Sequence, residues 1–338
     1  MTITASTLAI SFILTAAGVI LLTPVAIRLA HRLGFYDIPN GRKVHAKPTP
    51  LLGGLAVFSA TLLVLLLVGT LVGARIDGAR AGFLVGAVVI FIVGLVDDRF
   101  GLSVGGKLFG QIIAAACLVL TGNTDGLIGN SPIALVLCLV WTVGIINAVN
   151  FLDGLDGLAA GTTLLAGLAF AVVGLVGGQP YPALVAAIVA GSALGFLRWN
   201  WSPARIFLGD AGSLFLGYLL AALGLMSTWD KSSLAYLLVP VIVLGVPIFD
   251  ITFVVAVRLL EGRAISKPGK DHTSHRILRL LRSVPSAALV FHVASLVLGA
   301  TAVTLATLAS PVLLVAGATA CTILFTLLGR GLSRVPVG

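Results

Sequence analysis

The chain has 338 residues, of which 59% are hydrophobic and only 10% are charged, and its formal net charge is +9. A soluble domain typically carries about 25% charged residues, so this composition excludes an ordinary soluble protein. Apolar stretches of about 18 or more residues are typical of membrane spans, and the chain contains many of them. The three cysteines lie singly in apolar stretches, with no disulfide or metal-binding spacing.

Eleven membrane-spanning helices are predicted from these stretches, all within a single domain of residues 1–338. The first stretch has no basic segment before it and no small-residue cleavage site, so we interpret it as a helix and not as a removed signal peptide. The expected fold is an all-α polytopic membrane protein. In chain order the expected spans are 3–27, 51–73, 81–97, 106–122, 131–148, 157–176, 181–198, 211–228, 234–258, 284–305 and 309–328.

Positive charge is distributed unevenly over the segments that connect these spans. If the N-terminus lies outside, all of the 21 lysines and arginines face the cytoplasm except Arg75, Arg80 and Lys231. Lysine and arginine are retained on the cytoplasmic side of a membrane. The pattern therefore predicts an outside N-terminus in the inner (plasma) membrane, and it accounts for the net charge without a nucleic-acid partner.

The acidic residues gather on the same face. Of the twelve acids, all but Asp77, Asp125 and Asp230 lie in or beside the predicted cytoplasmic segments. Acids contribute little to orientation, so their concentration needs another cause. A carboxylate at a membrane boundary is by default a functional candidate, and the active site is therefore predicted on the cytoplasmic face.

The first acidic cluster is the pair Asp97 and Asp98 in GLVDDRFGLSVGGK. Adjacent residues of a helix point about 100° apart, so both side chains can share a target only at a helix end. Arg99 and the glycine-rich stretch after it indicate such an end. The alternative interpretation is a solvated helix terminus in which the acids pair with Arg99.

The second cluster is NFLDGLDGLAAG, where Asp153 and Asp156 stand three residues apart and share one helix face. They lie near the start of the next predicted span, so capping of its N-terminus is an alternative explanation for one of them. Capping does not explain both acids, nor Asn147 and Asn150 one turn earlier.

Two further cytoplasmic segments carry candidate residues. FLGDAGS places Asp210 directly before a predicted span, and here too helix capping is the alternative. The polar loop that ends in DHTSHR contains His272, His275 and Arg276. These residues suit a metal-binding pair or a cationic clamp for phosphate, although lone loop histidines more often serve neither purpose.

Taken together, these segments indicate a specific chemistry. Five aspartates from three segments on one face suit a hard, oxygen-ligated cation such as Mg²⁺, whereas zinc prefers Cys or His at fixed spacing. Lysines 47 and 107 and the loop histidines add positive charge. A mixed acidic and basic cluster suits phosphoryl transfer from a nucleotide, and the apolar spans offer access to a lipid substrate.

The same segments resemble the signature segments of the polyprenyl-phosphate N-acetylhexosamine-1-phosphate transferases, and the WecA-like and TagO-like branch is closer than the MraY branch. The resemblance implies transfer of a sugar-1-phosphate from a UDP-sugar to polyprenyl (undecaprenyl or decaprenyl) phosphate. It also implies Mg²⁺, with Mn²⁺ as an alternative ion, release of UMP, initiation of a cell-envelope glycan and a homodimer. The matching stretches are KVHAKPTPLLGG (43–54), DD (97–98), GLSVGGKLFGQ (101–111), NAVNFLDGLDG (147–157), FLGDAGS (207–213) and DHTSHR (271–276).

Carried over by position, the resemblance implies a role for each matching residue. Asp210 would bind Mg²⁺ at the diphosphate, Asp97 and Asp98 would act on the lipid phosphate or the metal, and Lys107 would bind phosphate. The nucleotide would contact Lys47, Asn150, Asp153, Asp156, Asn200 and Phe207, and the diphosphate would contact His272, His275 and Arg276. A phosphate monoester with a second pKa near 6 is already mostly dianionic at neutral pH. We therefore expect Asp97 and Asp98 to bind metal and position substrate without an obligatory proton abstraction.

Two features depart from the pattern or stay open. Many relatives carry a third loop histidine where this chain has Ser274, so the sugar is open, with N-acetylglucosamine favoured. The histidine-rich loop of the MraY branch is absent, which argues against a UDP-MurNAc-pentapeptide substrate. Asp250 lies in an apolar span after Pro247, and structural pairing and a catalytic role are both open for it.

Two rival functions are disfavoured by where the acids lie. A transporter places its acids near the membrane midplane, within broken spans, whereas here all candidate acids except Asp250 fall at one face. A CDP-alcohol phosphatidyltransferase would need Ala-Arg shortly after the DG pair and a later pair of aspartates. Residues 153–165 lack both features.

Overall fold

A computed structural model describes residues 3–39, 47–122, 131–226, 233–264 and 269–336. Apart from one short hairpin, the regular structure in these residues is helical, which confirms the all-α expectation. The elements are α1 (Ala5–Leu33), β1 (Tyr36–Asp37), β2 (Thr49–Pro50), α2 (Gly53–Leu71), α3 (Gly78–Phe100), α4 (Val104–Val119), α5 (Pro132–Leu152), α6 (Leu158–Val176), α7 (Pro180–Asn200), α8 (Gly209–Met226), the 3₁₀ turn η1 (Leu234–Leu237), α9 (Leu238–Val243), α10 (Gly245–Leu260), α11 (Thr273–Leu281), α12 (Val284–Thr307) and α13 (Pro311–Ser333).

Nine helices of the described chain are long and apolar enough to cross a membrane. Two predicted spans take another form. The span expected at 106–122 is the 16-residue helix α4, and the span expected at 234–258 is bent by 83° where α9 meets α10. Proline and glycine weaken helix continuity, and Pro240, Gly245 and Pro247 surround this bend. A multi-pass membrane protein is thus confirmed, whereas the count of eleven spans and the orientation stay predictions.

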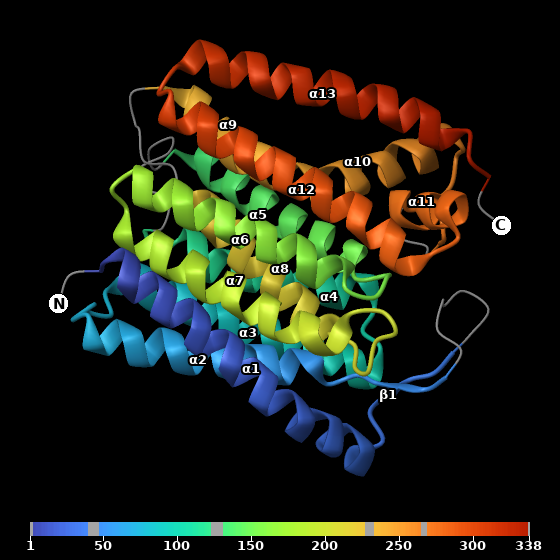
Figure 1. Cartoon of the computed structure of the whole chain (residues 1–338), viewed down its shortest axis with the longest axis horizontal. Helices are drawn as coiled ribbons and strands as arrows, with labels where there is room; N and C mark the ends of the chain where they lie inside the picture. The colour runs from blue at the N-terminus through green and yellow to red at the C-terminus, as the bar shows by residue number, and fades with distance from the viewer. Residues whose placement is uncertain (1–2, 40–46, 123–130, 227–232, 265–268, 337–338) are drawn as a thin grey trace.

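The helices form one bundle around α8 (Figure 1), which is buried along almost its whole length. α3 and α5 pack directly on α8, and α6 packs on α7 on the other side of the bundle. Small residues allow the close approach of membrane helices. A side-chain carbon on Gly174 of α6 would lie 2.9 Å from the backbone nitrogen of Ala183 in α7. α13 lies at the periphery and is exposed along nearly all of its length.

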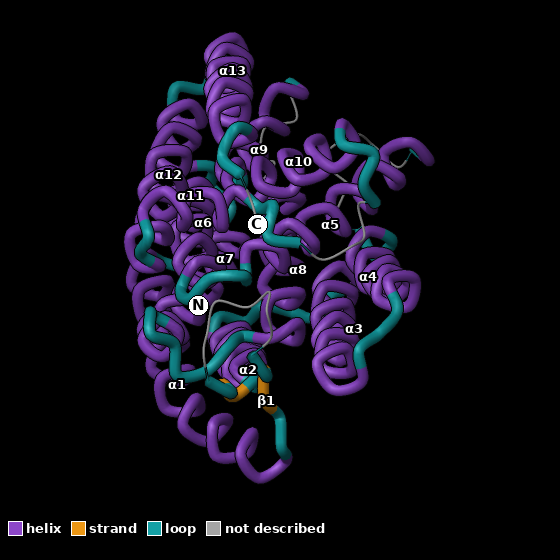
Figure 2. The backbone as a smooth tube through the Cα atoms, turned by 90° about the vertical axis from the view of Figure 1, so that its right-hand side faces the viewer, coloured by secondary structure: helices purple, strands orange, loops and turns teal. Residues whose placement is uncertain are grey.

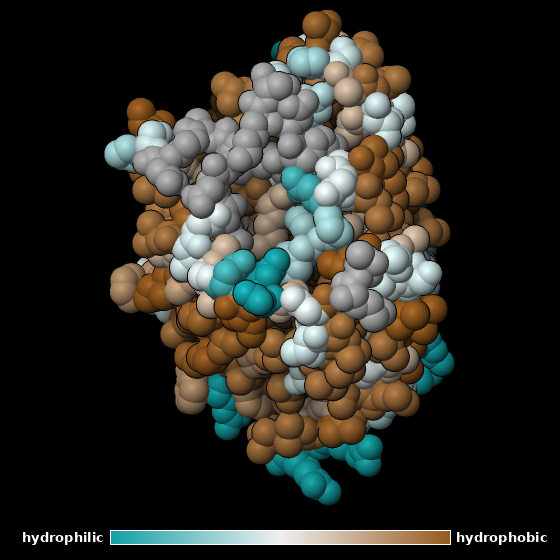
Figure 3. Space-filling view, turned by 90° about the vertical axis from the view of Figure 1, so that its left-hand side faces the viewer, coloured by the Kyte–Doolittle hydropathy of each residue, from teal (hydrophilic) through white to brown (hydrophobic). Residues whose placement is uncertain are grey.

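One end of the bundle carries the hairpin, α11 and the C-terminus, while the N-terminus lies at the opposite end (Figure 1). We call the first of these the polar end, and Figure 2 looks onto it. The predicted cytoplasmic acids of α3, α8 and the α5–α6 connection all belong to this end. Figure 3 shows the opposite end and its flanks, where most of the described surface is hydrophobic.

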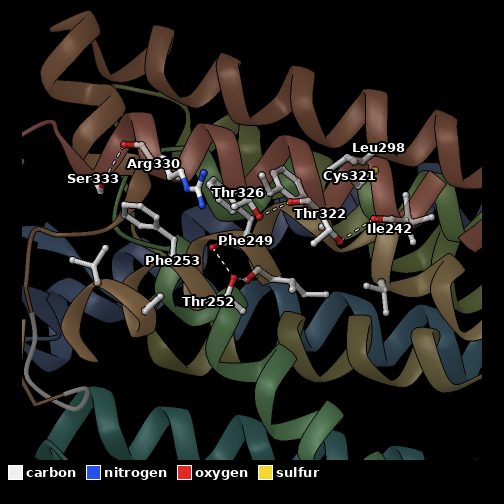
Figure 4. Close-up of a pocket in the computed structure, with 18 of the residues that line it drawn as sticks. Ile242, Phe249, Thr252, Phe253, Leu298, Cys321, Thr322, Thr326, Arg330 and Ser333 are labelled. Carbon is white, nitrogen blue, oxygen red and sulfur yellow. Dashed lines mark hydrogen bonds between the residues drawn. The ribbon is translucent and has the colours of Figure 1, made fainter. Parts of the chain in front are cut away.

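A groove of about 590 Å³ separates α10 from α13, and we call it the apolar groove (Figure 4). Phe249, Phe253 and Phe325 line it together with aliphatic side chains. Its threonines add little polarity, because the hydroxyls of Thr252 and Thr322 donate to carbonyls of their own helices.

Candidate active site

The polar end contains a cavity of about 330 Å³, which we call the acidic cavity. Parts of the chain that are far apart in sequence build it, from the hairpin to α11. Eight of the residues predicted for the site line it, and they come from α3, α5, α7, α8, α11 and the loops beside them. The lining consists of Asp37, Leu51, Asp98, Asn150, Asp153, Gly154, Leu155, Asp156, Asn200, Phe207, Gly209, Asp210 and His275.

Lys107 joins the two acidic helices beside this cavity. Its ammonium nitrogen lies 3.0 Å from Asp97 Oδ2 and 2.9 Å from Asp210 Oδ2, and it donates to Asn150 Oδ1 at 3.3 Å. The residue is close to the start of α4, where the Ser103 side chain caps the helix. One cation therefore balances carboxylates from α3 and α8 and connects them to α5.

Asp98 caps α8 from a different helix. Its two carboxylate oxygens accept from the backbone amides of Asp210 and Ala211, at 2.8 and 2.9 Å. A carboxylate is stabilised there by the unpaired amides and the dipole of the helix N-terminus. Gly209 makes room, since a side-chain carbon on it would lie 2.6 Å from Asp98 Oδ2. The N-terminus of α8 is therefore capped by Asp98 and not by Asp210, the residue for which capping was the alternative. The Asp210 carboxylate faces Lys107.

Asparagines on α5 complete this arrangement. The Asn150 amide nitrogen donates to Asp210 Oδ1 and, at 2.8 Å, to Ser213 Oγ. One turn earlier, Asn147 exchanges two hydrogen bonds with Gln111 of α4. The two asparagines that capping left unexplained therefore attach α5 to two different helices, and only Asn150 reaches the cavity.

The α5–α6 connection places Asp153 near several other carboxylates. Among the described residues no group donates a hydrogen bond to its carboxylate. Burial raises the pKa of the Asp153 carboxyl well above its usual range, and the charges of Asp210, Asp98, Asp156 and Asp37 raise it further. Among the described residues, five carboxylates thus line a small cavity, and His275 is the one lining side chain there that can carry positive charge.

Asp156 and Asn200 tie two loops together. Asp156 Oδ2 accepts from the Ala204 amide at 3.0 Å. The buried Asn200 side chain accepts from the Gly157 amide at 2.9 Å and donates to the Ile206 carbonyl at 3.0 Å. Both polar ends of Asn200 are therefore bonded to backbone, which gives it a positioning function at the cavity wall.

The loop histidines occupy different places. His275 lines the cavity, and a side-chain carbon on Gly154 would lie 3.6 Å from its Nε2. Burial lowers the pKa of His275 below its usual value, so most of this imidazole is neutral at pH 7. His272 stands at the N-terminus of α11 outside the lining, with Nδ1 2.8 Å from Asp250 Oδ2.

Arg276 is absent from the described lining of the cavity, and its contact with the diphosphate stays a prediction. Its guanidinium is buried, lies 5.2 Å from the Phe253 ring centroid, and donates to the carbonyls of Leu332, Ser333 and Val335 at the end of α13. Although only three residues lie between Arg276 and His272, the Arg276 side chain points from α11 towards the C-terminal segment. Its observed contacts are structural.

The loop before α11 is fixed by a buried ion pair that the sequence did not indicate. Arg258 donates to both carboxylate oxygens of Asp271, at 2.8 and 2.7 Å. Although burial opposes it, this guanidinium holds the pKa of the Asp271 carboxyl well below its usual range.

Lys47, which the sequence predicts as a nucleotide contact, lies exposed just before β2 and is absent from the described cavity lining.

The donor set fits a hard divalent cation in its chemistry, since the cavity offers carboxylate and amide oxygens. Among the described residues, no three His, Cys, Asp or Glu side chains are grouped closely enough to form a complete metal cage. Mg²⁺ commonly uses one or two carboxylates and completes its shell with water and substrate phosphates. Asp210 and Asp153 are the residues best placed to provide such carboxylates, because both line the cavity and neither is held by backbone amides as Asp98 and Asp156 are.

The fold and the site together define a polytopic membrane protein with an acidic cavity at one end of its bundle. Residues 80–228 match the sequence profile of glycosyl transferase family 4. A probable undecaprenyl-phosphate N-acetylglucosaminyl 1-phosphate transferase of Bacillus subtilis is 36% identical over 305 residues, which cover 88% of this chain and 84% of that protein.

Two further relatives point the same way. A decaprenyl-phosphate N-acetylglucosaminephosphotransferase of Mycobacterium tuberculosis is 36% identical over 298 residues, covering 78% of this chain and 74% of that protein. A phospho-N-acetylmuramoyl-pentapeptide-transferase of Desulforudis audaxviator is 36% identical over 271 residues, covering 67% and 79%. The chain belongs to this family of membrane sugar-phosphate transferases, which confirms the resemblance found in its sequence.

Proposed function

We propose that the protein transfers N-acetylglucosamine 1-phosphate from its UDP-sugar to a polyprenyl phosphate and releases UMP, at the cytoplasmic face of the plasma membrane. The observation that carries this proposal is the convergence of eight predicted site residues from distant segments on one acidic cavity. Relatives with 36% identity are named for this transfer to undecaprenyl and decaprenyl phosphate. The product would begin a cell-envelope glycan.

The reaction joins two phosphates. A lipid phosphate oxygen attacks the phosphorus that bears the sugar, a new diphosphate bond forms, and the bond to UMP breaks. Because a phosphate monoester is largely dianionic at pH 7, the nucleophile needs no base. This agrees with the geometry of Asp98, whose oxygens bind the α8 amides, and of Asp97, whose oxygens bind Lys107 and the Leu102 amide.

The lipid substrate has a natural approach beside α4. Leu108, Phe109 and Ile112 are exposed on this helix, directly after Lys107, whose ammonium reaches the cavity acids. An isoprenoid chain can lie against this apolar surface while its phosphate meets the lysine. The arrangement supports Lys107 as the residue that receives the lipid phosphate.

Mg²⁺ is part of this proposal, because five carboxylates line a cavity that must accept a diphosphate. When bound, the ion would neutralise phosphate oxygens, and Asp210 and Asp153 would hold it. Asn150 keeps the Asp210 carboxylate in place, and Asn200 and Asp156 fix the loop that bears Asp153. Ser274 is buried and is absent from the described lining of the acidic cavity.

The test is a transfer assay with purified protein in nanodiscs. Radiolabelled UDP-sugars, undecaprenyl phosphate and Mg²⁺ are supplied, and UMP and labelled lipid are measured with and without EDTA. We expect equal amounts of both products with UDP-N-acetylglucosamine and a loss of activity with EDTA. If transfer occurs only from a different UDP-sugar, the sugar named in the proposal is wrong but the reaction is right. Solute flux without UMP release would support a transporter.

A further inference from the structure

Asp250 is a carboxylate deep inside the helix bundle that the transfer mechanism above does not use. It belongs to α10 and its side chain is fully buried. A buried charge is costly unless it is paired and hydrogen-bonded. Among the described residues, the hydrogen bonds of Asp250 all come from one neighbouring segment, the start of α11.

Each oxygen of Asp250 has a defined partner. Oδ1 accepts from the Thr273 backbone amide at 2.8 Å and from the Thr273 hydroxyl. Oδ2 lies 2.8 Å from His272 Nδ1. An ionised carboxylate can only accept hydrogen bonds, so His272 Nδ1 must carry the hydrogen. In a neutral ring this leaves Nε2 as the nitrogen with a lone pair.

Through His272, Asp250 is connected to the acidic cavity by ring contacts. His272 lies edge-on to Phe151 with ring centroids 5.2 Å apart, and its ring centroid is 6.3 Å from that of His275. His275 lines the cavity one helical turn further along α11. The bonds from Asp250 therefore fix the start of the helix that presents both histidines.

We propose that Asp250 is a positioning residue for the transfer reaction, which sets the Nδ1–H tautomer of His272 and holds the start of α11, so that His275 faces the substrate diphosphate with the His272 imidazole next to it. This inference rests on the proposed function. In metal sites, a carboxylate that bonds the second nitrogen of a histidine has this effect, and its loss typically costs about 10- to 100-fold in activity or affinity.

The variant Asp250→Asn keeps the contact with the Thr273 amide but changes the contact with His272. The Thr273 amide can only donate, so it retains the asparagine oxygen, and the asparagine NH₂ then faces His272. That NH₂ group cannot accept a hydrogen, so the imidazole must change to the Nε2–H tautomer. We expect kcat to fall about 10- to 100-fold, with KM for the UDP-sugar changed by less than about threefold.

The experiment uses the full-length protein in nanodiscs and a double-mutant cycle. If Asp250 acts through His272, the variant with both Asp250→Asn and His272→Asn is no slower than His272→Asn alone, because coupled residues are non-additive. Thr273→Val is the matched control, since it removes one bond to Asp250 without touching the imidazole, and we expect it to retain activity within about threefold. Multiplicative losses in the cycle would overturn the proposal.

A second readout does not depend on activity. Nitrogen-15 NMR of histidine-labelled protein identifies the tautomer, and His272→Asn assigns the signal. We expect Nδ1–H in the native protein and Nε2–H in Asp250→Asn. An Nε2–H tautomer in the native protein would overturn the inference even if the variant failed to fold. If transfer is absent while the tautomers behave as expected, the proposed function fails and the positioning of His272 stands.

Discussion

The acidic cavity and the apolar groove both contain polar side chains, but these bond in opposite ways. In the groove, the hydroxyls of Thr252 and Thr322 donate to carbonyls of their own helices, and most of the lining is apolar, although Arg330 also borders the groove (Figure 4). At the cavity, Lys107, Asn150 and Asp98 bond to partners on other helices. The bonds at the cavity cross between helices, so the partners fix one another's position around it, whereas the threonine bonds in the groove stay within one helix.

The largest expected effect concerns the carboxylate that receives most of these bonds. Asp210→Asn keeps the shape of the side chain but removes the charge that Lys107 and a bound cation need. We expect kcat to fall about 10²- to 10³-fold, the loss seen when one electrostatic contact to a transition state is removed. The UMP-release assay measures it, and near-normal turnover would place the reaction elsewhere.

A smaller loss is expected for the two acids of α3. Asp98→Asn can accept from only one of the two α8 amides that the carboxylate now binds, so Asp210 shifts. Asp97→Asn weakens the contact with Lys107. We expect each change to lower turnover about 10- to 100-fold by a factor that varies little from pH 6 to 9. Retention of normal rates by both variants over that range would contradict their assignment.

Stability should depend on pH through the buried pair of Arg258 and Asp271. The folded-state pKa of the Asp271 carboxyl lies below its unfolded value of about 3.9. The pair therefore stabilises fully above that unfolded value, and its contribution is lost as pH falls towards the folded-state pKa. We expect Asp271→Asn to lower Tm by several degrees at pH 7, with a difference from the native protein that shrinks below about pH 4. A difference that grows at low pH would contradict the pairing.

The smallest effect is expected in the apolar groove. Thr322→Val removes a hydroxyl that bonds only to the Ala318 carbonyl of its own helix. We expect turnover to stay within about twofold of the native value and Tm to stay within about 2 °C of it. Substitutions outside cores, caps and buried polar networks alter stability little. Loss of transfer in this variant would mean that the groove takes part in the reaction.

The features that the sequence predicted correctly depend on local patterns. Hydropathy located the apolar helices, because a span is a continuous stretch of chain. The basic residues assigned Asp98, Asp156 and Asp210 to one face of the membrane, and the structure places all three on one cavity. The orientation of that face stays a prediction. Asp37 was not selected, although its place in the first predicted cytoplasmic segment was a usable signal.

What the sequence could not predict depends on contacts between distant segments. Asp98 caps a helix that begins more than a hundred residues later, and Arg276 turns away from its histidine neighbours to bind the end of α13. A single sequence shows the capacity of each side chain to bond but not which partner the packed helices bring near. For the same reason Asp250 stayed open until α11 was seen beside it.

The central claim is that carboxylates from separate helices serve one cation and one diphosphate. Crystals grown with Mn²⁺ and UDP, measured at the manganese absorption edge, test it directly. We expect one anomalous peak in the acidic cavity, within ligand distance of Asp210 and next to the UDP phosphates. A bound UDP whose phosphates and manganese lie away from Asp210 and Asp153 would contradict it.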